Sequence, residues 1–226
     1  GTIYGANWTN DGKYGKALEF DGNDDYVHTS NELPTYNHSF TITAWIYRYS
    51  EKSTDDSIIQ NSKDGGANKY LHTTIRNNKP FFGFYYNDLS GETYISKNKW
   101  WLLSFTYDYE NNVRRIYVNG NLDAEDYPSP LLDNIIADIG GGNWGSYYFN
   151  GTIDEVRIYN RALTEEEIRQ LYQLGQTRIR PGNYYYRNST SDNILFAVQN
   201  FRPAYRGSFA DPKPSYFNLT EDSATR

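Results

Sequence analysis

The stretch that decides the fold runs from Phe149 to Tyr172 and reads FNGTIDEVRIYNRALTEEEIRQLY. Its first half alternates as a β-strand does, but its apolar residues change parity partway along. On an ideal strand, one side would carry Phe149, Gly151 and Ile153, and the opposite side would carry Val156 and Ile158. An extra residue at Asp154 or Glu155, a β-bulge, would return both sets to one core. The pattern therefore predicts a long, bulged strand.

A short helix is predicted directly after this strand. Thr164 is a favourable N-cap, and Glu167 lies three residues later, as in a capping box. Gly175 stands where a left-handed C-terminal cap would fall. We expect a helix from about Glu165 to Leu174.

Four segments together resemble one family. In chain order they are GKYGKALEFDGNDDYV at 12–27, FTITAWIY at 40–47, WWLLSFTYDYENNVRRIYVNG at 100–120 and IDEVRIYNRALTEEEI at 153–168. They are similar, in the same order, to the laminin G-like (concanavalin A-like) jelly-roll domains of secreted and cell-surface proteins. The resemblance covers residues 1–175 and implies an all-β, two-sheet antiparallel jelly-roll sandwich with one short helix. Residues 176–226 are then a C-terminal extension that packs on the sandwich or on a neighbouring subunit.

One strand of the family is missing here. In the resembling domains a strand precedes the equivalent of Gly1 and pairs near the closing strand. Its absence predicts an open slot beside Val156 and Ile158, which another segment must fill because an uncovered apolar edge invites pairing. The strand-like run Ile194 to Val198 is the candidate. It could fold back in cis or be donated by a neighbouring copy.

Composition excludes several classes of function. The formal net charge is -6, and no Lys- or Arg-rich stripe is present to neutralise a nucleic-acid backbone. The absence of Cys excludes disulfides and zinc-ribbon sites. No apolar run approaches the roughly 20 residues that span a bilayer. Because Met is also absent, we expect a processed or excised piece of a protein.

The resemblance implies a structural calcium site. Asp154 on the bulged strand and Asp21 in the Phe-Asp-Gly turn are at positions where similar domains often hold calcium, which prefers several oxygen ligands. Asp24 and Asp25 are reserve candidates in the same turn. The alternatives are a turn-capping role for Asp21 and a hydrogen-bonded carboxylate near the strand end for Asp154.

Carbohydrate binding is common in the resembling family, and aromatic faces suit sugar rings. The candidate residues are Trp45, Tyr47, Trp144 and the pair Tyr147-Tyr148. Alternation in 40–49 assigns Trp45 and Tyr47 to the outer face of their strand. The alternative is that these aromatics are packed or covered by the extension.

Glycoside hydrolases share this sandwich, but hydrolysis needs two suitably spaced carboxylates. No predicted strand carries that spacing, and none of the histidines lies in a recognisable nucleophile setting: His28, His38 and His72. We therefore expect no enzyme activity.

The expected function is a non-catalytic extracellular adhesion or assembly module, as in a surface or filament subunit completed by strand exchange. Its expected partners are copies of itself or other surface proteins. A carbohydrate-binding, lectin-like domain is the alternative, and a glycoside hydrolase domain is a distant one. Five glycosylation sequons favour a secreted or cell-surface protein; they begin at Asn7, Asn37, Asn150, Asn188 and Asn218.

Overall fold

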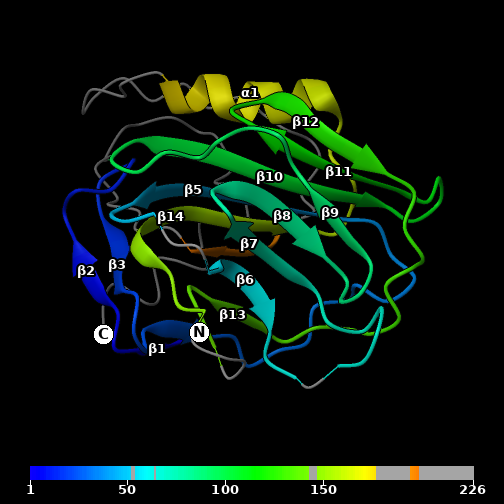
Figure 1. Cartoon of the computed structure of the whole chain (residues 1–226), viewed down its shortest axis with the longest axis horizontal. Coiled ribbons are helices and arrows are strands. Elements are labelled where there is room, and N and C mark those ends of the chain that lie inside the picture. The colour runs from blue at the N-terminus through cyan, green and yellow to red at the C-terminus, as the bar shows by residue number, and fades with distance from the viewer. Residues whose placement is uncertain (52–53, 64, 143–146, 177–193, 199–226) are drawn as a thin grey trace, which may run out of the picture.

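The structure is a computed structural model that describes residues 1–51, 54–63, 65–142, 147–176 and 194–198, the last segment as a backbone strand. Two antiparallel sheets pack face to face over one hydrophobic core (Figure 1). This arrangement confirms the predicted two-sheet jelly-roll sandwich with one short helix. Within the described residues, no helix is long and apolar enough to cross a bilayer.

The seven-stranded sheet has the order β1-β4-β13-β6-β7-β8-β9. Its strands are β1 (Thr2–Tyr4), β4 (Tyr26–His28), β13 (Ala137–Ile139), β6 (Asp56–Asn61), β7 (His72–Arg76), β8 (Lys79–Gly83) and β9 (Asp88–Ser90). β7 and β8 form an antiparallel hairpin. Its turn residues Asn77 and Asn78 both have positive φ, which Asn tolerates better than most residues.

The eight-stranded sheet has the order β12-β11-β10-β5-β14-β3-β2, and β15 pairs with β14 beside this path. Its strands are β12 (Asn121–Asp126), β11 (Val113–Val118), β10 (Trp100–Asp108), β5 (Phe40–Arg48), β14 (Asn150–Tyr159), β3 (Ala17–Asp21), β2 (Asn7–Thr9) and β15 (Ile194–Val198).

The closing strand β14 has the predicted bulge. Its register with β5 shifts between Asp154 and Arg157, and Glu155 has a φ of 50°. On both sides of the bulge the apolar side chains lie in the core, where Ile153 is 2% exposed and Val156 is 1% exposed. The parity change in the sequence therefore identified the bulge correctly.

The helix α1 (Glu165–Gln176) lies on the outer side of the eight-stranded sheet, next to β12 (Figure 1). The capping box is confirmed: the Glu167 N–H donates to Thr164 Oγ1 at 3.3 Å, and the Thr164 N–H donates to Glu167 Oε2 at 2.9 Å. The predicted C-terminal cap is wrong, because Gly175 lies inside the helix. Packing explains the glycine instead, because a Cβ at position 175 would lie 2.1 Å from Trp45 Cζ2.

Candidate functional site

The floor of the candidate site is a row of outward-facing side chains on β6 and β7. Ile75 belongs to the core cluster, so alternation along β7 places His72 and Thr74 on the outer face. The register then sets Ser57 of β6 opposite Thr74, and Gln60 opposite His72. Polar residues of two consecutive strands therefore meet on the outer side of the seven-stranded sheet.

A pocket of about 490 Å³ lies over this row. Its volume is in the range of small-molecule sites, roughly 300–1,000 Å³. Most of its described lining residues come from β6, β7 and the adjoining loops, while Tyr85 follows β8 and Tyr147 precedes β14. The others are Thr54, Asp55, Ser57, Gln60, Tyr70, His72, Thr74, Arg76 and Asn77.

Aromatic rings stiffen the pocket and its surroundings. Tyr70 and Tyr85 meet edge to face, with their ring centroids 6.3 Å apart. The His72 ring stacks on Phe81 of β8 at 5.7 Å, and the Arg76 guanidinium lies 3.8 Å from the centroid of the same Phe81 ring. These contacts restrict the rotamers of four side chains that line the pocket.

The charged groups of the pocket neutralise one another. Arg76 donates two hydrogen bonds to Asp55, at 2.7 and 2.6 Å, and this pairing raises the pKa of Arg76. Burial lowers the pKa of His72, although Asp88, 3.9 Å from its Nε2, acts in the opposite direction. Among the described lining residues, the site therefore presents no free positive charge to a ligand.

Hydrogen-bonding capacity remains unused at the base of the pocket. Within the part of the chain that the structure describes, Ser57 Oγ and Gln60 Nε2 are buried without a hydrogen-bond partner. Asp138 Oδ2, beside Gln60 on β13, is in the same situation, whereas its Oδ1 accepts a hydrogen bond from His28 Nδ1 at 2.7 Å. Buried groups of this kind are costly unless water or a ligand satisfies them.

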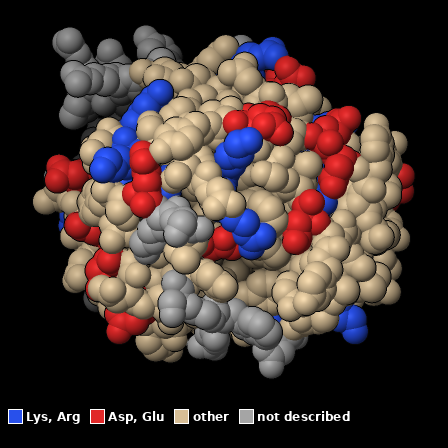
Figure 2. All heavy atoms as spheres, in the orientation of Figure 1, with Lys and Arg blue, Asp and Glu red and all other residues tan. Residues whose placement is uncertain are grey.

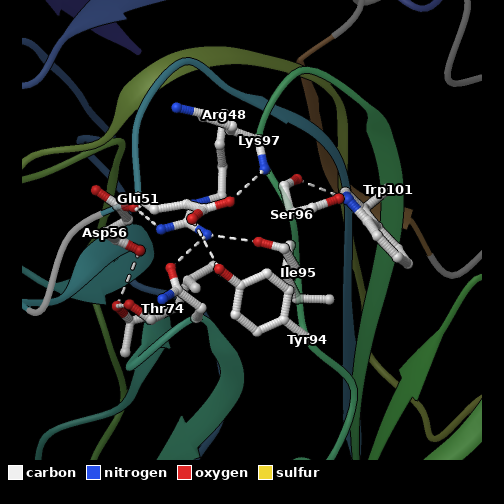
Figure 3. Close-up of polar contacts among 11 residues, drawn as sticks. Arg48, Glu51, Asp56, Thr74, Tyr94, Ile95, Ser96, Lys97 and Trp101 are labelled. Atoms are coloured by element: carbon white, nitrogen blue, oxygen red, sulfur yellow. Dashed lines mark hydrogen bonds and ion pairs between the residues drawn. The ribbon is translucent and has the colours of Figure 1, made fainter.

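A buried ion pair holds the loops at one end of the pocket (Figure 3). Arg48 at the end of β5 donates two hydrogen bonds to Asp56 Oδ2, at 3.0 and 2.8 Å, and both side chains are fully buried. Its Nη1 also donates to Asn78 Oδ1 at 3.1 Å and to the Ile95 carbonyl at 2.6 Å. Arg48 thus joins the eight-stranded sheet to the seven-stranded one.

The same network continues to the surface. Glu51 accepts a hydrogen bond from the Tyr94 hydroxyl at 2.7 Å and one from the Lys97 N–H at 3.3 Å (Figure 3). Two lining residues, Asp55 and Asn77, directly precede residues that Arg48 binds. The shape of this end of the pocket therefore depends on one buried cation.

The predicted carbohydrate-binding residues fall in different places. Tyr147 lines the pocket and is 44% exposed. Tyr47 lies on the outer face of the other sheet, half-buried against Trp100 with the ring centroids 5.5 Å apart. Trp144 lies outside the described residues.

The interpretation of Trp45 as an exposed aromatic is wrong. Trp45 does point outward from β5, but α1 covers it, so that it is 3% exposed. Its ring stacks on Tyr172 of the helix at 5.8 Å, and Lys13 Nζ lies 4.3 Å from its centroid. Strand alternation gave the correct face but not what covers that face.

The structure separates the two predicted calcium ligands. Asp21 lies opposite Asn150 in the register of β3 and β14, so Asp154, four residues further along, is roughly 13 Å away. The Asp154 carboxylate accepts hydrogen bonds from the N–H groups of Tyr14, at 2.9 Å, and Glu155, at 2.8 Å. The two aspartates therefore cannot share one ion.

Asp21 instead meets the two reserve candidates of its own turn. Carboxylate oxygens of Asp21, Asp24 and Asp25 all lie within 4.8 Å of one another. Asp25 Oδ2 accepts a hydrogen bond from the Asp21 N–H at 2.8 Å, and burial raises the pKa of Asp25. Calcium binding at this turn stays a prediction.

Three of the five sequon asparagines belong to the described residues. Asn7 and Asn37 are exposed, as glycosylation requires. Asn150 is half-buried, and its side chain donates to the Asp21 carbonyl at 2.9 Å. Asn188 and Asn218 lie outside the described residues.

Several pocket residues were not predicted from the sequence, notably Gln60, His72 and Arg76. The available signal was Ile75, the one apolar residue of 72–76, because strand alternation counted from it assigns His72, Thr74 and Arg76 to the outer face. Their convergence with 54–57 and 147 depends on strand register, which the sequence does not display.

Comparisons with known proteins agree with this architecture. Among curated proteins, no sequence matches the chain. A Bacteroides ovatus protein described as a "putative carbohydrate binding protein" is similar in structure, with a TM-score of 0.59 and 19% identity over 80% of this chain and 50% of that one. Domain 4 of AbnA, an extracellular GH43 arabinanase of Geobacillus stearothermophilus solved with arabinotriose, gives 0.56 and 22% identity over 76% and 82%.

The receptor-binding domain of botulinum neurotoxin D is also similar, with a TM-score of 0.58 and 15% identity over 76% of this chain and 46% of that one. The chain thus spans about half of the first and third of these proteins. At such identities the likeness shows a shared fold. The family profile described as the concanavalin A-like lectin/glucanases superfamily matches residues 21–169, so the chain belongs to this superfamily.

Proposed function

We propose that this chain is a non-catalytic extracellular module that binds a neutral saccharide in the pocket over β6 and β7. The observation that carries the proposal is the combination of buried, unsatisfied groups with tyrosine rings in one pocket of saccharide size. Ser57 Oγ and Gln60 Nε2 need partners, and Tyr70, Tyr85 and Tyr147 line the same space. Sugar hydroxyls both donate and accept hydrogen bonds, while the C–H faces of the ring pack on aromatic rings.

Charge supports a neutral ligand rather than an acidic one. Arg76, the cation among the described lining residues, is already bound by Asp55, and Asp88 lies near His72. Among the described residues of the pocket, a uronate or sialate carboxylate would meet these acids and no free cation that could bind it. On the face drawn in Figure 2, basic and acidic side chains are interspersed and form no large patch of one sign.

The carboxylate count supports a binding role over hydrolysis. Among the described lining residues, Asp55 is the one acid, and it is paired with Arg76. Glycoside hydrolysis in most families requires two carboxyl groups across the scissile bond. The similarity to a domain of an arabinanase therefore supports an ancillary binding role for this chain.

The test is a glycan array followed by calorimetric titration of the best ligand. We expect neutral oligosaccharides to bind and acidic ones to be rejected. Tyr147→Ala should weaken binding about 2- to 12-fold, because one aromatic contact contributes about 0.5–1.5 kcal/mol. Tyr36→Ala is the matched control, since Tyr36 is 46% exposed and lies outside the pocket. Preferential binding of acidic glycans, no binding at all, or equal effects of the two substitutions would refute the proposal.

A second candidate function is adhesion or assembly, as in a surface or filament subunit. The observation that favours it is the pairing of β14 with β15, a segment beyond the residues that the family profile matches. Sedimentation velocity on the intact chain and on a chain ending at Gly175 tests this function. Assembly of the intact chain alone would support it, and monomers in both samples at high concentration would refute it.

A further inference from the structure

The eight-stranded sheet contains an internal slot beside the second half of β14. Along one edge, β14 pairs with β5 both before and after the bulge. Along the other edge of β14, β3 pairs with Asn150 to Ile153 and no further. Beyond the bulge, the four residues Val156 to Tyr159 would present an unpaired backbone edge in the middle of the sheet without an additional strand.

The slot exists because the chain before β3 turns away at the bulge. The Asp154 carboxylate binds the Tyr14 N–H, which holds the segment before β3 off the edge of β14. Val156 and Ile158 are each 1% exposed and belong to the core. An open slot would therefore uncover both core side chains and leave backbone groups without partners.

The strand that fills this slot is β15. Its register sets Val198 opposite Val156, Ala197 opposite Arg157 and Phe196 opposite Ile158. Within the described residues, β15 pairs with β14 and with no other strand. The segment is therefore added to a sandwich whose other strands all pair among themselves.

The position of β15 in the chain allows it to reach a neighbour. It follows α1 after residues 177–193. At about 3.3 Å per residue, a connection of this length spans up to about 56 Å, well over the diameter of a small domain. The same strand can thus pair with its own sheet or with the sheet of an adjacent copy, in the same register and with the same ladder.

We propose that β15 is an exchangeable strand and that its partner in trans is the slot beside Val156–Tyr159 of a second copy of this chain. The proposal rests on the assembly function given above as the second candidate. Pairing in cis has an effective concentration on the order of millimolar, so it prevails in dilute solution. Exchange takes over when copies are crowded to that range, as on a surface or along a filament.

The test uses the absence of cysteine from the chain, because any disulfide must then come from introduced residues. Arg157→Cys and Ala197→Cys are placed in separate copies, since these positions are register partners. The two proteins are mixed at millimolar concentration and oxidised. The expected result is a covalent heterodimer that disappears on dilution before oxidation. Lys97→Cys mixed with Ala197→Cys is the control for random collision, since Lys97 is exposed and lies outside the slot.

The double variant Arg157→Cys/Ala197→Cys reports pairing in cis, as an intramolecular disulfide in dilute solution. If this disulfide forms but the mixture gives no more heterodimer than the control, exchange is overturned, even where sedimentation shows assembly through another surface. If neither disulfide forms, the pairing itself is wrong and the proposal fails. If the heterodimer forms while sedimentation finds no lasting assembly, exchange stands and the assembly function fails. Where Arg157→Cys does not fold, Tyr159→Cys with Ile194→Cys tests the same ladder.

Discussion

Replacing Arg48 by Met removes the buried cation that joins the two sheets beside the pocket. Met keeps much of the side-chain volume but donates none of the four hydrogen bonds to Asp56, Asn78 and Ile95. The fully buried Asp56 carboxylate would then lose its ion pair with the Arg48 guanidinium. Removal of one partner from a buried ion pair costs about 3–5 kcal/mol. We expect this loss in the free energy of unfolding.

Urea unfolding followed by circular dichroism measures the effect. With a slope of about 3 kcal/mol per M urea, the midpoint should fall by about 1–1.7 M. Arg115→Met is the matched control, because Arg115 pairs with Glu125 on the surface, where both side chains are about one-third exposed. Exposed pairs contribute about 0–1 kcal/mol. Equal losses for the two variants would refute the assignment of Arg48 as the residue that joins the sheets.

Three shorter predictions concern other parts of the sandwich. Trp45→Ala should lower the free energy of unfolding by about 3–5 kcal/mol, because it removes the ring beneath α1, and should leave the saccharide affinity unchanged. Thermal melts measure the stability and calorimetry measures the affinity. A loss of affinity in a folded variant would mean that Trp45 belongs to the binding site after all. Burial and the neighbouring Glu155 raise the pKa of Asp154 to about 7, so its contribution to stability is complete below about pH 4 and is lost as the pH rises through 7. The urea midpoints at pH 5 and pH 8 should therefore differ less in Asp154→Asn than in the wild type. An unchanged difference would contradict the raised pKa. Calcium should raise the melting temperature by relieving repulsion among the carboxylates of residues 21–25, and Asp24→Asn should reduce this shift; an equal shift in the variant, or none in the wild type, would exclude calcium from this turn.

The sequence predicted those features that local rules determine. The parity change around Asp154 predicted the bulge, because side chains alternate strictly along a strand. Thr164 and Glu167 predicted the helix start, because a capping box acts within one turn. The missing family strand predicted a slot, and the strand-like run 194–198 is the segment that pairs there.

The features that the sequence did not reveal depend on the register between strands and on which distant segment covers a given face. Trp45 faces outward as alternation requires, yet a helix more than 100 residues later in the chain buries it. The pocket combines residues from β6, β7 and the segments at 54–55 and 147, and no local pattern shows that these meet. Likewise, a motif match placed Asp21 and Asp154 in one calcium site, whereas the pairing of Asp21 with Asn150 separates them along β14.

The pocket and the strand slot belong to different sheets, so occupation of one leaves the other free. Copies joined through β15 would therefore present several saccharide pockets on one particle. Multivalent attachment of this kind strengthens binding about 10²- to 10⁴-fold without any new contact. The disulfide-linked heterodimer of the Arg157→Cys and Ala197→Cys chains should thus bind a surface coated with the saccharide more tightly than the monomer does. Its affinity for the free sugar should equal that of the monomer. A change in affinity for the free sugar would show that the two sites are coupled through the core, and equal binding of dimer and monomer to the coated surface would mean that the paired pockets cannot engage one surface together.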